Sequence, residues 1–203
     1  ELVNVDFSGM EMVVLVHTSQ EPNLIAFYNL KDADMHSYVA SKVFKELEGL
    51  GLDEIKTNHK EERSLAKQGG FSIVFGGTGF TVARNLNIPL EKGIEFETGY
   101  FEAFPELKAF FDTMLELTLA NGYITLDFKT NSQLNILGVD KLKESLKYYS
   151  FDNKAFWNTY KEEKKKNSKE FLKLKDQVSK YFKLISKIKR NSQNYIIQGS
   201  SAS

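Results

Sequence analysis

The residue types with the clearest chemistry are two cations and two aromatic rings that follow one another at steps of four: Arg63, Lys67, Phe71 and Phe75. Side chains four residues apart lie on one face of an α-helix. A guanidinium and an ammonium one turn apart can bind a triphosphate, and the rings beyond them can stack on a base. The alternative is a solvated helix face, on which both cations pair with neighbouring glutamates.

A second candidate is Asp6, a carboxylate in the middle of an apolar, strand-like run between Val5 and Phe7. Burying a carboxylate is costly unless it binds a cation or accepts hydrogen bonds. The residue is therefore either a metal ligand or a cap for the helix expected from Gly9. The residues around it leave both interpretations open.

Three further features have a structural and a functional interpretation. Gly69 and Gly70 weaken the helix that carries the cations, so they need a reason, such as close approach of a ligand or another backbone. The glycines of 76–79 predict a turn and match no P-loop, because no Gly-Lys-Ser/Thr follows. His36 is either a structural histidine or a phosphate donor.

Composition excludes several classes of protein. The 203 residues contain no Cys, which rules out disulfides and thiolate chemistry, and 41% of them are hydrophobic. No apolar run is long enough for a membrane span and no secretory signal is visible, so we expect a soluble, cytoplasmic protein without a membrane partner. Lys+Arg and Asp+Glu both number 27, but residues 1–60 carry a net charge of −5 and residues 161–190 one of +8.

These residues must be positioned by a mostly helical chain with few strands, an α+β fold. An Asn121-Gly122 turn predicts a β-hairpin. Lys-rich amphipathic helices follow over 141–190, with breaks near Ser150 and Asn167. The other expected elements are a strand at 2–8 and helices at 9–18, 22–30, 32–47, 53–75, 81–87, 89–103 and 105–120.

Taken in order, several segments resemble the motifs of family A DNA polymerases, the DNA polymerase I type, with a phage-like member as the nearest pattern. The resemblance covers nearly all of 1–203 and is weakest over about 127–189. The segments that carry it are VDFSGME (5–11), DMHSYVASKVF (34–44), RSLAKQGGFSIVFG (63–76), RNLNIP (84–89), YFEAFPELKAFF (100–111) and RNSQNYIIQGSSAS (190–203).

The resemblance implies a role for each matching residue. Asp6 and the Phe7 carbonyl would bind two Mg²⁺ ions, and Glu11 would be the steric gate against ribonucleotides. His36, Arg63 and Lys67 would contact the triphosphate of a dNTP, with Lys67 donating a proton to the leaving pyrophosphate. The remaining residues would pack on the incoming nucleotide (Phe71), guard the templating position (Phe75, Gly76) or touch the primer–template (Arg190, Asn194, Gln198).

The resemblance also implies an architecture, the fingers plus part of the palm. Residues 1–30 would be a palm part, 31–121 the fingers with the nucleotide-binding helix at 56–75, and 122–203 the hairpin, the Lys-rich helices and the return to the palm. The chain departs from the pattern in places. Gly9 replaces a usual Gln, Phe75 replaces a usual Tyr, and DFKTNS (127–132) stands where an Arg-rich turn is usual.

The family's His-Asp-Glu palm motif, which carries a second metal-binding Asp, is missing from the chain. One carboxylate holds two Mg²⁺ ions poorly. We therefore expect that the chain alone does not polymerise DNA and that a further segment or a separate chain supplies the rest of the palm. The alternatives are a subunit of a split polymerase and a non-catalytic nucleic-acid-binding module.

Overall fold

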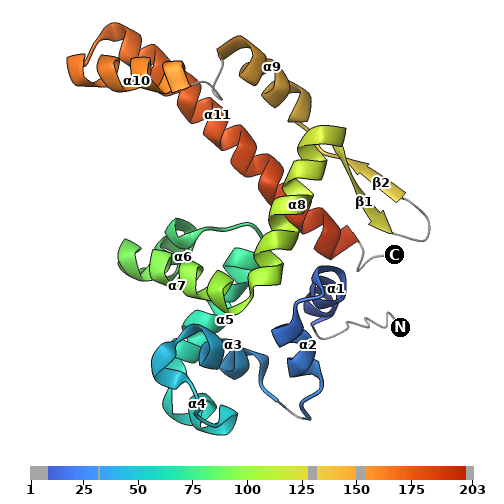
Figure 1. The fold of residues 1–203 in the computed structure, drawn as a ribbon. Coiled ribbons are helices and arrows are strands. Elements are labelled where there is room, and N and C mark those ends of the chain that lie inside the picture. Colours follow the sequence, from blue (N-terminus) through green and yellow to red (C-terminus); the bar gives the residue numbers. More distant parts are fainter. Residues whose placement is uncertain (1–8, 32, 128–131, 150–153, 200–203) are drawn as a thin grey trace, which may run out of the picture. The chain divides into compact units, whose positions relative to one another are not determined.

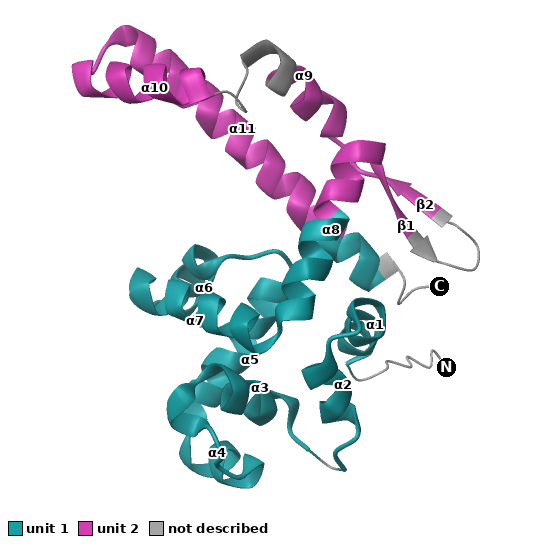
Figure 2. Cartoon of the chain, viewed as in Figure 1, with its two compact units in different colours: residues 1–114, 193–203 teal, residues 115–192 magenta. Residues whose placement is uncertain are grey.

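The structure, a computed structural model, describes residues 9–31, 33–127, 132–149 and 154–199 (Figure 1). The strand expected at 2–8, with Asp6 and Phe7, lies outside the described residues. The chain divides into two compact units, which we describe separately (Figure 2). Unit 1 comprises residues 1–114 and 193–203, and unit 2 comprises residues 115–192.

The described part of unit 1 is helical, with two helices that begin at proline, as expected from the fixed φ of that residue. Its elements are α1 (Met10–Ser19), α2 (Pro22–Tyr28), α3 (Met35–Val43), the short 3₁₀ turn η1 (Lys45–Leu47), α4 (Leu52–Asn58), α5 (Lys60–Val74), α6 (Gly79–Leu86), α7 (Leu90–Ala103), the first part of α8 (Pro105–Asn121) and the π-turn η2 (Tyr195–Gly199).

Two expected helices are shorter than the sequence pattern suggested. The helix expected over 53–75 is interrupted at His59, whose φ of −117° and ψ of 55° are not helical, so the cation-bearing helix begins at Lys60. The residues before this break, Thr57 and Asn58, are weak helix formers. The helix expected over 32–47 ends at Val43, and the 3₁₀ turn after it buries the Leu47 side chain completely.

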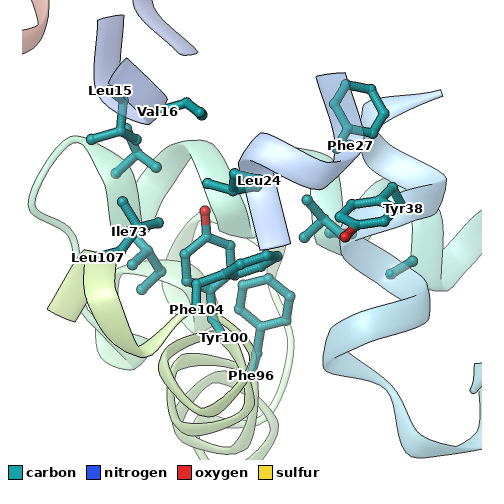
Figure 3. Close-up of a cluster of buried hydrophobic side chains, with 14 of the residues drawn as sticks. Leu15, Val16, Leu24, Phe27, Tyr38, Ile73, Phe96, Tyr100, Phe104 and Leu107 are labelled. Atoms are coloured by element: carbon teal, nitrogen blue, oxygen red, sulfur yellow. The ribbon is translucent and has the colours of Figure 1, made fainter. Parts of the chain in front are cut away.

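Aromatic rings from α7 occupy the middle of the unit 1 core (Figure 3). Phe96, Tyr100 and Phe104 follow one another at steps of four, with ring centroids 6.0 and 5.1 Å apart. Leu15 and Leu24 from the first two helices and Leu107 from α8 complete the same cluster. Burial raises the pKa of the Tyr100 hydroxyl well above its ordinary value.

A buried carboxylate joins two helix starts in this unit. Glu21 is fully buried, and its Oε1 accepts a hydrogen bond from the Asn23 N–H at 3.1 Å, in the first turn of α2. Its Oε2 accepts one from the Glu106 N–H at 2.9 Å, in the first turn of α8. Both contacts satisfy donors that lack helical partners and place negative charge at the positive end of a helix.

Unit 2 contains the predicted hairpin and the predicted Lys-rich helices. Strands β1 (Tyr123–Asp127) and β2 (Ser132–Asn135) pair antiparallel after Gly122, which has a φ of 84°. The helices are α9 (Val139–Tyr149), α10 (Lys154–Lys166) and α11 (Lys169–Asn194). The break at Asn167 is confirmed by its φ of 48°, whereas the break expected near Ser150 lies outside the described residues.

Together the elements confirm a mostly helical α+β fold. Of the helices within the described ranges, none combines the length and the apolar character needed to span a bilayer.

Candidate functional site

An arginine–aspartate pair forms the centre of the candidate site. Asp34 precedes α3, and Arg63 lies in the first turn of α5. The Arg63 Nε donates to Asp34 Oδ2 and its terminal nitrogen to Oδ1, both at 2.8 Å. This bidentate geometry fixes the plane of the guanidinium, and each of its charge-assisted hydrogen bonds is stronger than a neutral one.

Asp34 also caps α3. Its Oδ2 accepts hydrogen bonds from the Ser37 N–H and the Ser37 hydroxyl, both at 2.8 Å. The hydrogen bonds from Arg63 and Ser37 hold the pKa of Asp34 far below its ordinary value, against the opposing effect of burial. Sequence reasoning missed this residue, although an Asp three residues before a Ser at a helix start is a capping pattern.

His36 and Lys67 complete the group. Burial lowers the pKa of His36 below its ordinary value, the charge of Asp34 raises it, and the charges of Lys67 and Arg63 lower it further. The imidazole therefore lies within electrostatic reach of all three. Lys67 is exposed, and no salt bridge involves it in the part of the chain that the structure describes. The site thus combines the guanidinium of Arg63, which Asp34 holds in place, the solvent-facing ammonium of Lys67 and the neutral imidazole of His36.

Phe71 and Phe75, at the end of α5, lie on one side of the helix, as the spacing predicted, and their rings also stack on each other. The centroids of Phe71 and Phe75 are 6.1 Å apart and the ring planes 20° apart. Phe71 is 42% exposed, whereas Phe75 ends the helix and packs against the core. An exposed ring one turn beyond Lys67 offers a planar apolar face to a ligand.

The glycine pair lies beside aromatic rings of α7. A Cβ at Gly69 would lie 2.6 Å from the Phe96 ring, and a Cβ at Gly70 would lie 3.4 Å from the Tyr100 ring. Gly69 therefore admits the Phe96 ring of α7, whereas a Cβ at Gly70 would make an ordinary van der Waals contact. At Gly69 the close neighbour is a side chain and not another backbone.

The turn expected over 76–79 is a helix terminus. Gly76 has a φ of 81°, and its N–H donates to the Ile73 carbonyl while the Gly77 N–H donates to the Ser72 carbonyl at 2.7 Å. These two bonds are the Schellman pattern that ends α-helices. The next helix, α6, already begins at Gly79, so only the first two glycines form the turn.

The remaining site residues lie on other elements. Glu11 lies half-buried in the first turn of α1, which packs against η2. Gln198 is exposed on η2, and the buried Oδ1 of Asn194 has no partner among the described residues. Arg190 is exposed on α11 in unit 2.

A metal site cannot be assembled from the described residues. Within the described ranges no three His, Asp or Glu side chains are grouped closely enough to hold an ion. The expected ligands, Asp6 and the Phe7 carbonyl, lie outside those ranges.

Comparisons with known proteins add the family. The family model for DNA polymerase family A matches residues 1–203. DNA polymerase I of Caldicellulosiruptor bescii is 29% identical over 149 residues, 73% of this chain and 16% of the relative. DNA polymerase I of Bacillus caldotenax is 32% identical over 59% of this chain and 13% of the relative, and that of Borreliella burgdorferi is 34% identical over 60% and 12%.

A solved structure shares the fold. The polymerase domain of Pol1 from M. smegmatis, in complex with DNA primer-template and dNTP, superposes with a TM-score of 0.64 at 19% identity. The match covers 96% of this chain and 26% of that one. The chain thus spans a small part of the proteins that it resembles, and the match of the family model over all its residues shows that it belongs to DNA polymerase family A.

Proposed function

We propose that the chain forms the nucleotide-binding part of a DNA polymerase that transfers deoxynucleotides to a primer 3′-hydroxyl under the direction of a template. The observation that carries the proposal is that Arg63 and Lys67 lie within electrostatic reach of His36, with the exposed ring of Phe71 one turn beyond Lys67 on α5. Family membership supports it, as does the fold shared with a polymerase domain bound to DNA and dNTP. The proposed division into a palm part (1–30), fingers (31–121) and a third part (122–203) follows the same resemblance.

In the proposed binding mode, Asp34 positions Arg63. A guanidinium carries five N–H donors, and the two bonds to Asp34 leave the others for phosphate oxygens. Lys67 adds an ammonium one turn further along the helix, and it would give a proton to the leaving pyrophosphate. His36 is neutral at neutral pH, because burial and the two cations oppose its charge, and it would gain charge when an anion arrives.

Phe71 would pack on the sugar and base of the incoming nucleotide, and Phe75 with Gly76 would border the templating position. Glu11 would exclude a 2′-hydroxyl. Arg190, Asn194 and Gln198 would contact the primer–template. These assignments rest on the matching motif positions.

Two Mg²⁺ ions, held by Asp6, the Phe7 carbonyl and a carboxylate from outside this chain, would activate the primer hydroxyl and neutralise phosphate charge. Asp6 and Phe7 are not among the described residues. We propose that the chain alone is inactive and needs a segment or a second chain with the missing carboxylates. A non-catalytic nucleic-acid-binding module is the other candidate, favoured by the basic helices of unit 2.

Triphosphate binding tests the first part of the proposal. Isothermal titration with a dNTP should show a loss of at least about tenfold in affinity for Arg63→Ala and for Lys67→Ala, since each removes a charge-assisted hydrogen bond. Lys60→Ala is the matched control, because Lys60 is an exposed lysine on the same helix, outside the group. Equal losses in all three variants would contradict the proposed site.

Primer extension tests the second part. We expect incorporation only when a palm segment with the missing carboxylates is added, and no incorporation with Asp6→Ala. Incorporation by the unsupplemented chain would refute the proposed inactivity. DNA binding without incorporation in either case would favour the non-catalytic module.

A further inference from the structure

A stripe of cations runs along the outside of α11. At 100° per residue, six exposed cationic side chains fall within about 100° of one another around the helix axis, an arc that also contains the exposed Leu172 and Asp176. We call them the α11 stripe: Lys169, Lys173, Lys180, Lys183, Lys187 and Arg190. They extend over about 32 Å at 1.5 Å per residue, the length of about nine base pairs.

The opposite face of α11 is held by the rest of unit 2. Its apolar residues recur at steps of three and four and are buried or half-buried: Phe171, Leu174, Val178, Tyr181, Ile185 and Ile188. From α10, the Tyr160 ring lies 5.5 Å from Phe171 and the Trp157 ring 6.1 Å from Phe182. Before α9, Gly138 has only a hydrogen where a Cβ would lie 2.8 Å from Leu184. The stripe therefore faces solvent on a supported helix.

The turn that reverses the chain between α10 and α11 is also ordered. Asn167 adopts a φ of 48°, and the Ser168 hydroxyl accepts a hydrogen bond from the Phe171 N–H at 3.0 Å. The same hydroxyl donates to Glu163 at 2.6 Å. Hence α10 and α11 form a helical hairpin with a capped turn (Figure 1).

Charge compensation on the hairpin is sparse. From Lys154 to Arg190 there are 13 Lys and Arg against four Asp and Glu, a net charge of +9. Glu170 and Asp176 pair with Lys173 and Lys180. Across the described part of the chain, no carboxylate lies within 4.0 Å of the ammonium groups of Lys169, Lys183 or Lys187.

We propose that the α11 stripe binds the phosphate backbone of a nucleic-acid duplex without regard to sequence. A regular row of lysines on a straight helix suits repeated phosphate charges. The stripe lacks aromatic side chains, which both single-strand binding sites and protein interfaces concentrate. Since the apolar face is packed within unit 2, α11 also lacks the open apolar face of a membrane-surface helix.

The surface is distinct from the nucleotide site proposed above, shares Arg190 with the proposed primer–template contacts and lies mainly in the segment where the family resemblance is weakest. Its test needs no nucleotide, so it stands or fails independently of the proposed polymerase activity. The assay is fluorescence anisotropy of two labelled 20-base-pair duplexes of unrelated sequence, titrated with the intact protein over a series of KCl concentrations.

The test variant is K169Q/K183Q/K187Q. We expect the slope of log affinity against log salt to become shallower by about 2 to 3, close to 0.9 for each lost phosphate contact. Affinity at low salt should fall at least about tenfold for both duplexes. The charge-matched control K45Q/K56Q/K92Q removes three exposed lysines of unit 1 and should keep the wild-type slope. The variant K169R/K183R/K187R should also keep it, and far-UV circular dichroism should show the same helix content throughout.

An unchanged slope in the triple glutamine variant would overturn the proposal. So would an equal change in the control, because the effect would then reflect net charge alone. Stronger stripe-dependent binding to single strands, or to vesicles containing anionic lipid, would assign the stripe to another partner and would likewise overturn it.

Discussion

The two units of this chain carry opposite charges and use aromatic residues differently. Unit 1 has 10 Lys and Arg against 18 Asp and Glu, a net charge of −8, whereas unit 2 has 17 against nine, a net charge of +8. In unit 1 the rings of Phe96, Tyr100 and Phe104 are buried, and one of the two arginines is held by Asp34. In unit 2 the aromatic rings form a single row of contacts between α10 and α11, which we call the seam, and the cations are numerous and exposed.

The comparison shows two ways of presenting positive charge to phosphate. In unit 1 few cations stand among many carboxylates, and the Asp34 carboxylate fixes the orientation of Arg63. Such an arrangement suits a single triphosphate bound in one position. In unit 2 flexible lysines repeat along a helix, and only some of them pair with a carboxylate of the same helix, as suits a long, uniform backbone. The neutral total charge of the chain hides this division.

The largest effect should come from the aromatic core, where the two units differ most. Phe96→Ala should destabilise unit 1 by about 3–5 kcal/mol, because it leaves a cavity in a fully packed core. Phe171→Ala in the seam of unit 2 should cost only about 2 kcal/mol, the value of burying one ring. Urea denaturation followed by circular dichroism measures both. Equal losses in the free energy of unfolding would contradict the contrast between the deep core of unit 1 and the seam of unit 2.

Gly69 supplies the control for this prediction. In the wild type, Gly69→Ala should destabilise the protein by about 1–3 kcal/mol, because the new Cβ meets the buried Phe96 ring. In the Phe96→Ala background the ring is gone, so the same change should stabilise the helix by about 1 kcal/mol. If Gly69→Ala destabilised the protein in both backgrounds, the Phe96 ring would not be the reason for a glycine at this position.

The next effect concerns Glu21, the one fully buried carboxylate among the described residues. Glu21→Ala should cost about 2–3 kcal/mol, because it removes an acceptor from the starts of both α2 and α8. Glu21→Gln keeps one acceptor oxygen and should cost about half as much. The measurement is the free energy of unfolding of each variant. If Glu21→Ala left this free energy unchanged, the two helix starts would have to find other acceptors.

The smallest effect is a pH dependence that sharpens the contrast between the ordered group in unit 1 and the stripe. The pKa of His36 is lowered in the free protein, and a bound polyphosphate should raise it. Binding then takes up a proton, so the affinity for tripolyphosphate should increase as pH falls from the pKa in the complex to the pKa in the free protein, by about tenfold for each unit of difference. Below and above this window the part of the dependence that is due to His36 should be flat, while the titration of tripolyphosphate itself affects the wild type and His36→Gln alike.

Titration calorimetry at several pH values measures this dependence, and the His36 ring protons report the pKa by NMR. In His36→Gln the proton-linked part should vanish. Duplex binding by the stripe should keep its affinity over the same window, because lysines stay charged there. A pH-independent affinity in the wild type would show that His36 does not contact the bound polyphosphate.

Much of this architecture was predictable from local patterns. The i, i+4 series of Arg63, Lys67 and Phe71, the Asn121-Gly122 hairpin and the break at Asn167 all follow from neighbours in the chain. What could not be predicted depends on partners far away in sequence. The Asp34–Arg63 pair spans 29 residues, and the Glu21–Glu106 contact spans 85.

The glycines illustrate the same limit. Gly76 could be read as a turn, because its positive φ is a local requirement. Gly69 could not be explained, because its cause is a ring from another helix. The two expectations differ only in whether the reason lies within five residues or across the core.

Local patterns were thus sufficient to predict most of the helices, the hairpin, the opposite charges of the two ends and the motifs of the family, since propensity, periodicity and motif spacing are properties of neighbouring residues. Only the folded chain shows which groups meet: Asp34 holds Arg63, Phe96 needs Gly69, and Glu21 joins two helix starts. Such meetings depend on packing, in which a side chain gains its partner only when separate elements bury their apolar faces together.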